Sequence, residues 1–359
     1  MKAMIVRSWN DPPAMALEDV AAPSPAPGEL LVSVDTASVN FGDTLIASGR
    51  YQVRPHLPFV PGTECSGVVA AIGEGLDGWS VGDHVAACGF IGNARVDRRI
   101  LGTFAERIAI PAANAVREPG HVALDQAALF RSNAETSLYG LQRAELKAGE
   151  TLLVLGASGG TGHAAVQLGK RMGARVIASA SSQEKRDIAL AAGADVAIDS
   201  RDPEWRARIA ELTDGRGVDV VYDPVGGDAT ERAFRSLAWR GRLVVIGFAA
   251  GTIPSIPANL ALLKGAAMIG ANLLEAQRLE PERTAANSRE LMALFAAGAL
   301  TVPPIARRYP LDAAAEALRL VASGEAAGRI VVDIAGMNND CQEVLGDAVH
   351  DSRDRTTGD

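Results

Sequence analysis

The sequence predicts an α/β protein in which a doubly wound parallel sheet accompanies a separate, β-rich barrel. Three observations support this fold class. Strand-like and helix-like segments alternate through residues 152–246, as they do in a parallel sheet covered by helices. A glycine-rich turn joins the first of these strands to its helix at residues 156–162. Short β-like runs separated by turn residues fill residues 1–116, which is typical of a compact barrel.

The barrel is predicted from short β-like runs near the start of the chain. They cover residues 2–6, 29–37, 68–72 and 84–87, and a proline-rich connection spans 21–28. Residues 111–116 end this part of the chain, and a helix over 125–141 leads into the glycine-rich turn. With 359 residues and 48% hydrophobic content, the chain has material for two cores of roughly 100 to 200 residues each.

The parallel sheet begins with the apolar strand 152–155, which is suited to burial on both faces. The helix that follows, 161–172, contains helix formers and no proline. Strands are then predicted at 175–179, 195–198, 218–222 and 242–246, and helices at 183–192, 204–212 and 229–238. A last helix, 313–323, and a last strand, 329–334, have no place in this series, so they are candidates to return to the barrel.

The glycine-rich turn has the spacing of a dinucleotide-binding site. Gly156, Gly159 and Gly162 stand three residues apart, which allows a sharp turn, close approach to a pyrophosphate and tight helix packing. The start of the helix then faces the phosphates. Ordinary turn chemistry explains the spacing equally well, but the alternating elements around it favour a nucleotide site. The contacts expected here come from Ser158, Gly159, Gly160, Thr161 and Gly162.

The end of the second strand of the sheet indicates which dinucleotide binds. A site selective for NAD places Asp or Glu about twenty residues after the turn, where it binds the ribose 2′-hydroxyl. The chain has small residues at 178–182, and its first acid, Glu184, already lies in the next helix. Ser181 and Lys185 would favour a 2′-phosphate, so we expect NADPH. The alternative is that Ser181 caps the helix and Lys185 is only solvated.

Composition excludes several classes of protein. The net charge of −8 makes nucleic acid an unlikely main partner, and every apolar run is too short to cross a membrane, so a cytoplasmic protein is expected. Cys65, Cys88 and Cys341 have no metal-like spacing and are expected to be reduced. The polar, acid-rich segment 335–359 is predicted to be a flexible tail.

Several stretches together resemble a known family. They are 39–43 (VNFGD), 48–51 (SGRY), 57–64 (LPFVPGTE), 156–162 and 223–227 (DPVGG). With them the chain resembles, from residue 1 to about 334, a medium-chain dehydrogenase/reductase of the zinc-independent quinone oxidoreductase branch. The resemblance implies a GroES-like catalytic domain, residues 1–124 and 300–334, and a Rossmann NADPH-binding domain, residues 125–299. It also implies a cleft between them and, commonly, a homodimer.

The same comparison argues against a metal. Where the zinc-dependent alcohol dehydrogenases carry Cys, His and Cys ligands, this chain has Asn40, Thr63 and Ser132. None of these supplies a thiolate or an imidazole, and a catalytic zinc needs three protein ligands of that kind. We therefore expect no metal, and the polarisation of the substrate must come from hydrogen-bond donors.

Two residues are candidates for contact with the substrate. Hydride addition to a quinone or enone places negative charge on the carbonyl oxygen, so a donor is needed there. Tyr51 falls where the resemblance places a substrate-cleft tyrosine, which is a proton donor in related enoyl thioester reductases. Asn40 can donate to the same oxygen or hold the nicotinamide ribose, as in related reductases. A rim position for Tyr51 and a turn cap for Asn40 are the alternatives.

Further cofactor contacts are expected beside the nicotinamide. The resemblance places Thr136 against the nicotinamide ring, although a role in core capping is an equal alternative. Gly247, Phe248 and Ala249 follow one strand and Val225 another, at the carboxyl ends where ligands bind in open α/β sheets. Simple turn chemistry is the alternative for these loops.

The chain also departs from well-known quinone reductases. Leu45 replaces a second cleft tyrosine, Ser200 replaces a phosphate-contacting tyrosine, and residues 271–273 lack an expected arginine. The pocket is therefore more apolar. We expect an NADPH-dependent reductase of a quinone or conjugated carbonyl compound, with an enoyl thioester reductase or a non-catalytic NADPH-binding sensor or scaffold as alternatives. Alcohol dehydrogenation is disfavoured by the missing zinc ligands.

Overall fold

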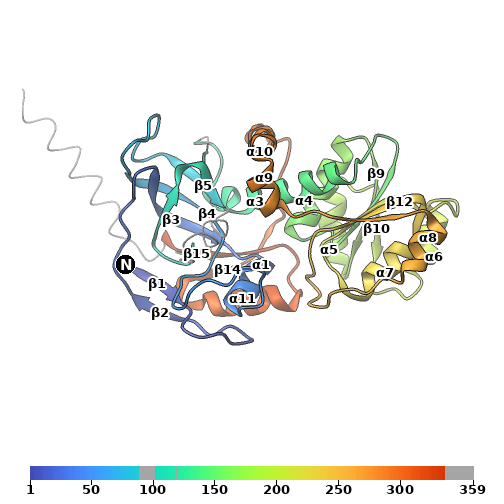
Figure 1. The fold of residues 1–359 in the computed structure, drawn as a ribbon, viewed down its shortest axis with the longest axis horizontal. Helices are drawn as coiled ribbons and strands as arrows, with labels where there is room; N and C mark the ends of the chain where they lie inside the picture. Colours follow the sequence, from blue (N-terminus) through green and yellow to red (C-terminus); the bar gives the residue numbers. More distant parts are fainter. Residues whose placement is uncertain (89–101, 119, 336–359) are drawn as a thin grey trace, which may run out of the picture.

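The structure is a computed structural model that describes residues 1–88, 102–118 and 120–335. Its chain forms two lobes side by side (Figure 1). The blue and teal N-terminal elements build the first lobe, and the green and yellow elements build the second. The red elements at the end of the described chain return to the first lobe.

The first lobe is built on a β-sheet with the strand order β14-β15-β3-β4-β5-β7, in which β6 also pairs with β3. Its early strands are β3 (Glu29–Ser38), β4 (Glu64–Ile72), β5 (His84–Cys88), β6 (Arg107–Pro111) and β7 (Ala115–Arg117), while β1 (Lys2–Ile5) and β2 (Ala16–Asp19) pair with each other in a separate two-stranded sheet of this lobe. The late ones are β14 (Ile305–Pro310) and β15 (Arg329–Asp333). The helices are α1 (Phe41–Ala47) and α11 (Ala314–Ser323).

The last strands of the described chain extend this sheet at one edge. Val331 of β15 pairs with Ser38 of β3 in an antiparallel register, and β14 runs parallel to β15. Buried apolar side chains from both ends of the chain share one core, to which Met4 and Val332 contribute. The expectation that the last helix and strand return to the first lobe is confirmed.

The second lobe contains a parallel sheet with the strand order β10-β9-β8-β11-β12-β13. The strands are β8 (Thr151–Leu155), β9 (Arg175–Ala180), β10 (Val196–Asp199), β11 (Val218–Asp223), β12 (Leu237–Val245) and β13 (Ala267–Gly270). Every residue of β8 is buried, as its apolar sequence predicts. The predicted fold class, a doubly wound parallel sheet beside a β-rich lobe, is confirmed.

Helices cover both faces of the second sheet. One face packs against α3 (Leu124–Arg143), α4 (Gly160–Arg171), α5 (Gln183–Ala191) and α10 (Pro281–Ala296). The other packs against α6 (Trp205–Leu212), α7 (Gly227–Arg235) and α8 (Ala258–Lys264). The helix α9 (Leu273–Leu279) precedes α10. The long helix α3 also contacts β4 and β5, so one helix borders both lobes.

Some predicted boundaries were wrong. The helix predicted over 229–238 begins at Gly227 and ends at Arg235, because Leu237 already pairs with Val218 in the sheet and is buried. The strand predicted over 68–72 begins at Glu64, because its first residues pair with β5. The short helix α1 was not predicted.

We propose the same division of the chain that the sequence suggested, with residues 1–124 and 300–334 in one domain and 125–299 in the other. The pairing of β15 with β3 supports it. Apart from Ala335, the predicted tail 335–359 lies outside the described residues, and so does Cys341. Cys65 and Cys88 are buried and free. Within the described ranges, no helix is long and apolar enough to span a bilayer.

Candidate active site

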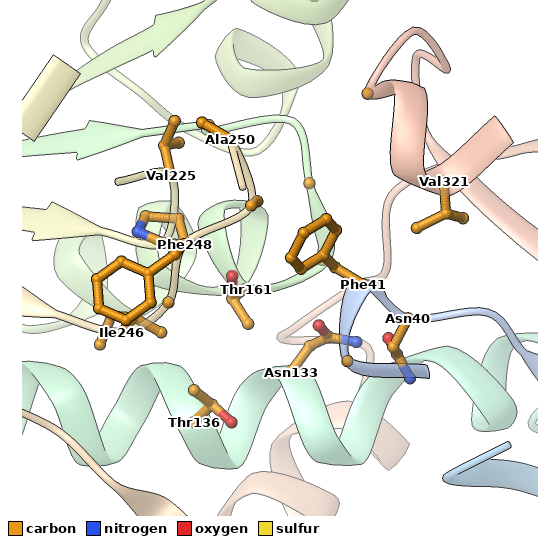
Figure 2. A pocket seen from close by; sticks show the side chains of 18 of the residues that line it. Asn40, Phe41, Asn133, Thr136, Thr161, Val225, Ile246, Phe248, Ala250 and Val321 are labelled. Carbon is orange, nitrogen blue, oxygen red and sulfur yellow. The ribbon is translucent and has the colours of Figure 1, made fainter. Parts of the chain in front are cut away.

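A cavity of about 1230 Å³ lies between the two lobes. Figure 2 shows Asn40 and Phe41 of the first lobe facing Thr161 and Phe248 of the second. The cavity brings together almost all the residues that the sequence pointed to. They are Asn40, Tyr51, Thr136, Ser158, Gly159, Gly160, Thr161, Ser181, Lys185, Val225, Gly247, Phe248 and Ala249. Gly162 does not line it.

The glycine-rich turn connects β8 to α4 and places the start of this helix in the cavity. Gly156 has a φ of 59°, a left-handed conformation that favours glycine. A Cβ atom added at Gly162 would lie 2.2 Å from the carbonyl oxygen of Gly156, so only glycine lets the helix approach the turn. Gly159 caps α4, whose first backbone N–H groups can bind an anion. This arrangement fits a dinucleotide pyrophosphate.

The helix α3 forms one wall of the cavity. Asn133 and Thr136 face the cavity from this helix (Figure 2). The Thr136 hydroxyl donates to the carbonyl of Ser132 at 2.8 Å, which fixes the side chain on the helix. The hydroxyl of the next residue, Ser137, donates to the carbonyl of Thr161 at 2.7 Å. The wall is thereby tied to the helix of the glycine-rich turn.

Two loops at the carboxyl ends of β11 and β12 form the opposite wall. Asp223, which is buried, accepts hydrogen bonds at 2.9 Å from the N–H groups of Val225 and Gly226. The N–H of Ala249 donates to the carbonyl of Pro224 at 3.1 Å and joins the two loops. Asp223 therefore shapes the loop and does not reach the cavity as a ligand.

The carboxyl end of β9 carries no acidic residue in the cavity. Ser182, and not Ser181, is the cap of α5, and its hydroxyl accepts from the N–H of Lys185 at 3.3 Å. The alternative in which Ser181 caps the helix was therefore wrong. The Lys185 ammonium lies 3.5 Å from the Ser181 hydroxyl and donates to the carbonyl of Gly324 at 2.5 Å. Burial lowers the pKa of Lys185, and the neighbouring Arg201 adds to this effect. A hydroxyl and a cation at this place fit a 2′-phosphate better than a 2′-hydroxyl.

A buried polar network lies behind the first-lobe wall. Arg329, at the start of β15, donates to Asn40 Oδ1 at 2.6 Å. Asn40 Nδ2 donates to Ser38 Oγ at 2.9 Å and to Glu64 Oε2 at 3.4 Å. Glu64 Oε1 accepts from the N–H of Ser132 at 2.8 Å. The Asn40 amide is held on both sides, so its orientation is set by the protein.

Two carboxyl groups in this network have displaced pKa values. Burial raises the pKa of Glu64 to about 7, although its hydrogen bonds and Arg329 act in the opposite direction. Burial likewise raises the pKa of Asp43 to about 6, against hydrogen bonds from the Asn40 N–H and the Thr63 hydroxyl. The chain therefore keeps proton-binding groups with near-neutral pKa values next to Asn40.

Arg329 is a site residue that sequence reasoning missed. It is buried with 8% of its surface exposed, and its Nε has no hydrogen-bond partner among the described residues. A Cβ added at Gly160 would lie 2.9 Å from Arg329 Nη1, so the guanidinium lies beside the glycine-rich turn. Burial lowers its pKa, while Glu64 and Asp43 oppose this. An arginine at the start of an otherwise apolar strand was the available signal, but its partner Asn40 lies far away in the sequence.

Tyr51 enters the cavity from the segment that follows α1. Its N–H donates to the carbonyl of Leu45 at 3.1 Å, and its ring packs partly against the first-lobe core. Leu45 also lines the cavity. The phenol and this apolar side chain therefore occupy the same part of the cavity.

The positions that hold zinc ligands in alcohol dehydrogenases also meet in this cavity. Asn40, Thr63 and Ser132 all line it, and they present an amide and hydroxyls. No group of three or more His, Cys, Asp or Glu residues suited to a metal is found in the part of the chain that the structure describes.

The fold and the cavity define a two-domain dehydrogenase or reductase of the dinucleotide-binding type. Two family models match the chain: the alcohol dehydrogenase GroES-like domain over residues 26–120 and the zinc-binding dehydrogenase over residues 160–288. A quinone oxidoreductase-like protein 2 homolog from Nematostella vectensis is 34% identical over 85% of this chain and 81% of its own length. The chain belongs to the medium-chain dehydrogenase/reductase superfamily, in its zinc-independent quinone oxidoreductase branch.

Two further similarities bear on the site. The Escherichia coli quinone oxidoreductase complexed with NADPH is 29% identical, with a TM-score of 0.82, over 93% of this chain and 100% of that one. A phthioceranic/hydroxyphthioceranic acid synthase from Mycobacterium tuberculosis is 34% identical over 92% of this chain but only 15% of its own length. The chain is thus also similar to one part of a much longer synthase.

Proposed function

We propose that this protein is an NADPH-dependent oxidoreductase that reduces a quinone or a conjugated carbonyl compound. One observation carries the proposal: a single cavity holds the glycine-rich turn of the second lobe and the polar residues Tyr51 and Asn40 of the first. NADPH binding by a similar quinone oxidoreductase supports the choice of cofactor. So do the missing acid after β9 and the presence of Ser181 and Lys185.

In this proposal, residues of the second lobe mainly bind the cofactor, and residues of the first lobe mainly contact the acceptor. When bound, NADPH supplies a hydride from C4 of its nicotinamide ring. Arg329 and the start of α4 would hold the pyrophosphate, while Thr136 and the loop 247–249 would flank the nicotinamide. Tyr51 would donate a hydrogen bond to the acceptor's carbonyl oxygen, where negative charge develops. Asn40, fixed by Arg329 and Glu64, would position the cofactor ribose or the acceptor.

A second candidate acceptor is an enoyl thioester. The sequence similarity to one part of a phthioceranic/hydroxyphthioceranic acid synthase favours it, and so does the apolar lining supplied by Leu45, Leu273 and Leu274. Assays of NADPH and NADH oxidation with quinones, enones and enoyl thioesters decide among the acceptors. Tight NADPH binding without turnover of any acceptor would instead favour a sensor or scaffold.

Substituting phenylalanine for Tyr51 tests the substrate side of the site. We expect Tyr51→Phe to lower kcat about tenfold, because one hydrogen bond to the developing oxyanion is lost. The NADPH Kd should stay within about twofold, since the hydroxyl is assigned to the acceptor. Steady-state kinetics on the best acceptor and NADPH titration measure the two effects. Tyr309→Phe, outside the cavity, is the matched control. Full turnover by Tyr51→Phe would refute the assignment.

We also propose that two copies of the chain pair through the edge strand β13. This strand is exposed along most of its length and forms its sheet contact with β12. Trp239, Leu262, Leu263 and Met268 expose large apolar side chains on or near β12, α8 and β13. Antiparallel pairing of β13 with its copy would use the open backbone groups and cover this apolar surface around a two-fold axis.

A charge on the edge strand tests this pairing. We expect Met268→Glu to raise the dimer dissociation constant at least about tenfold, because two symmetry-related carboxylates would be buried together. Sedimentation velocity across a concentration series measures it. Leu190→Glu, which charges an exposed leucine on α5, should leave the dissociation constant unchanged. A wild-type protein that is monomeric at high concentration would refute the dimer.

A further inference from the structure

Arg232 occupies the end of the cavity near β10. It lies on α7, and its Nη2 donates to the carbonyl of Ser200 at 3.3 Å. Its guanidinium stacks over the Trp205 ring, 5.1 Å from the ring centroid. Arg232, Trp205 and Ser200 all line the cavity. The packing on Trp205 fixes the direction of the guanidinium without neutralising its charge.

The sheet places Arg232 next to Ser181 and Lys185. Because β10 pairs with β9, the N–H of Ser200 donates to the carbonyl of Ala180 at 3.0 Å. Ser181 follows directly, and its hydroxyl lies 3.5 Å from Lys185 Nζ. Arg232 on α7 and Lys185 on α5 therefore lie at the same corner of the cavity.

The charges around this corner leave Arg232 without an anion. Asp199 is paired with Arg186 at 2.9 Å, and Glu231 is paired with Arg235 at 2.6 Å. Within the described ranges Arg232 forms no ion pair, and its buried Nε has no hydrogen-bond partner. A buried donor without an acceptor is costly unless a ligand supplies one.

We propose that Arg232 is a residue that determines cofactor specificity by binding the 2′-phosphate of NADPH together with Lys185 and Ser181. This assignment rests on the proposed NADPH site. A guanidinium offers several donors in a plane that matches phosphate oxygens, whereas a 2′-hydroxyl has no negative charge to pair with it. The contribution of Arg232 should therefore appear with NADPH and be absent with NADH.

Binding measurements on purified protein test this assignment without reference to turnover. Isothermal titration calorimetry with NADPH and with NADH gives the dissociation constants for the wild type, Arg232→Gln and Arg235→Gln. Arg235 lies on the same helix outside the cavity and is the matched control. We expect Arg232→Gln to weaken NADPH binding about tenfold and NADH binding less than about twofold. Arg235→Gln should change neither constant.

Several outcomes would overturn the assignment. Equal weakening for both dinucleotides would mean that Arg232 supports the adenine or the loop and not the 2′-phosphate. Unchanged NADPH binding would exclude any role. If Arg232→Gln does not fold, as judged by circular dichroism, Arg232→Lys replaces it as the test. This variant keeps the charge, and the assignment requires that its preference for NADPH over NADH fall below that of the wild type. A wild type that binds neither dinucleotide would refute the proposed function itself.

Discussion

Replacement of Arg329 by methionine is expected to weaken NADPH binding about 100-fold, because it removes a buried cation from the glycine-rich turn. The guanidinium lies next to Gly160 and leaves Nε without a partner among the described residues. A pyrophosphate at the start of α4 would supply the missing acceptor. NADH binding should weaken by the same factor, since both dinucleotides carry the pyrophosphate.

Fluorescence titration of the two dinucleotides measures this effect. Arg307→Met, on the exposed face of β14, is the matched control and should bind both with wild-type affinity. Arg329→Lys retains a charge and should recover part of the loss. Unchanged affinity in Arg329→Met would show that the guanidinium only holds Asn40, to which it donates at 2.6 Å.

The second large effect concerns stability and pH. Burial raises the pKa of Glu64 from 4.5 to about 7, so the folded protein binds a proton that the unfolded chain has released between these values. Below pH 4.5 the carboxyl is protonated in both states and has no effect; as the pH rises to about 7 the folded state loses stability. The displaced pKa corresponds to about 3 kcal/mol.

Denaturant unfolding at roughly pH 5, 6, 7 and 8 gives the free energy of unfolding at each pH and so measures this loss. These pH values span the displaced pKa of Glu64. We expect Glu64→Gln to lose about 1 to 3 kcal/mol less stability than the wild type across this range. The remaining slope of the variant comes from Asp43, with a pKa of about 6, from Glu118, whose pKa burial raises to about 7, and, in the opposite direction, from His163, whose pKa burial lowers to about 4. Glu211→Gln, an exposed acid on α6, should keep the wild-type slope. Equal slopes in all three proteins would contradict the assignment.

The sequence predicted the second lobe well because its strands are recognisable as short apolar runs. All of β8 is buried and four of its five residues are apolar, and the alternating strands and helices around its glycine-rich turn distinguish that turn from an ordinary one. The error at residues 236–238 arose because Leu237 and Ala238 suit a helix as well as a strand, and only the pairing with Val218 decides between them.

The first-lobe side of the site was harder to predict. The short helix α1 has no long periodic pattern by which to predict it, and its first turn is held by Asp43, which accepts from the Asn40 N–H at 2.7 Å. Arg329 was missed because its partner Asn40 lies 289 positions earlier, and no local pattern encodes such a contact. The roles of the site residues, the dimer and the cytoplasmic location stay predictions.

The return of β15 to β3 also determines when the site can form during synthesis. Chains leave the ribosome from the N-terminus, and domains fold as units once their residues are available. The second lobe is continuous in sequence, so it can fold while residues 36–38 of β3 still lack the strand 331–333 that pairs with them. Asn40 cannot be held by Arg329 until that same strand emerges. The active site can therefore be completed only after the whole of the second lobe has been synthesised.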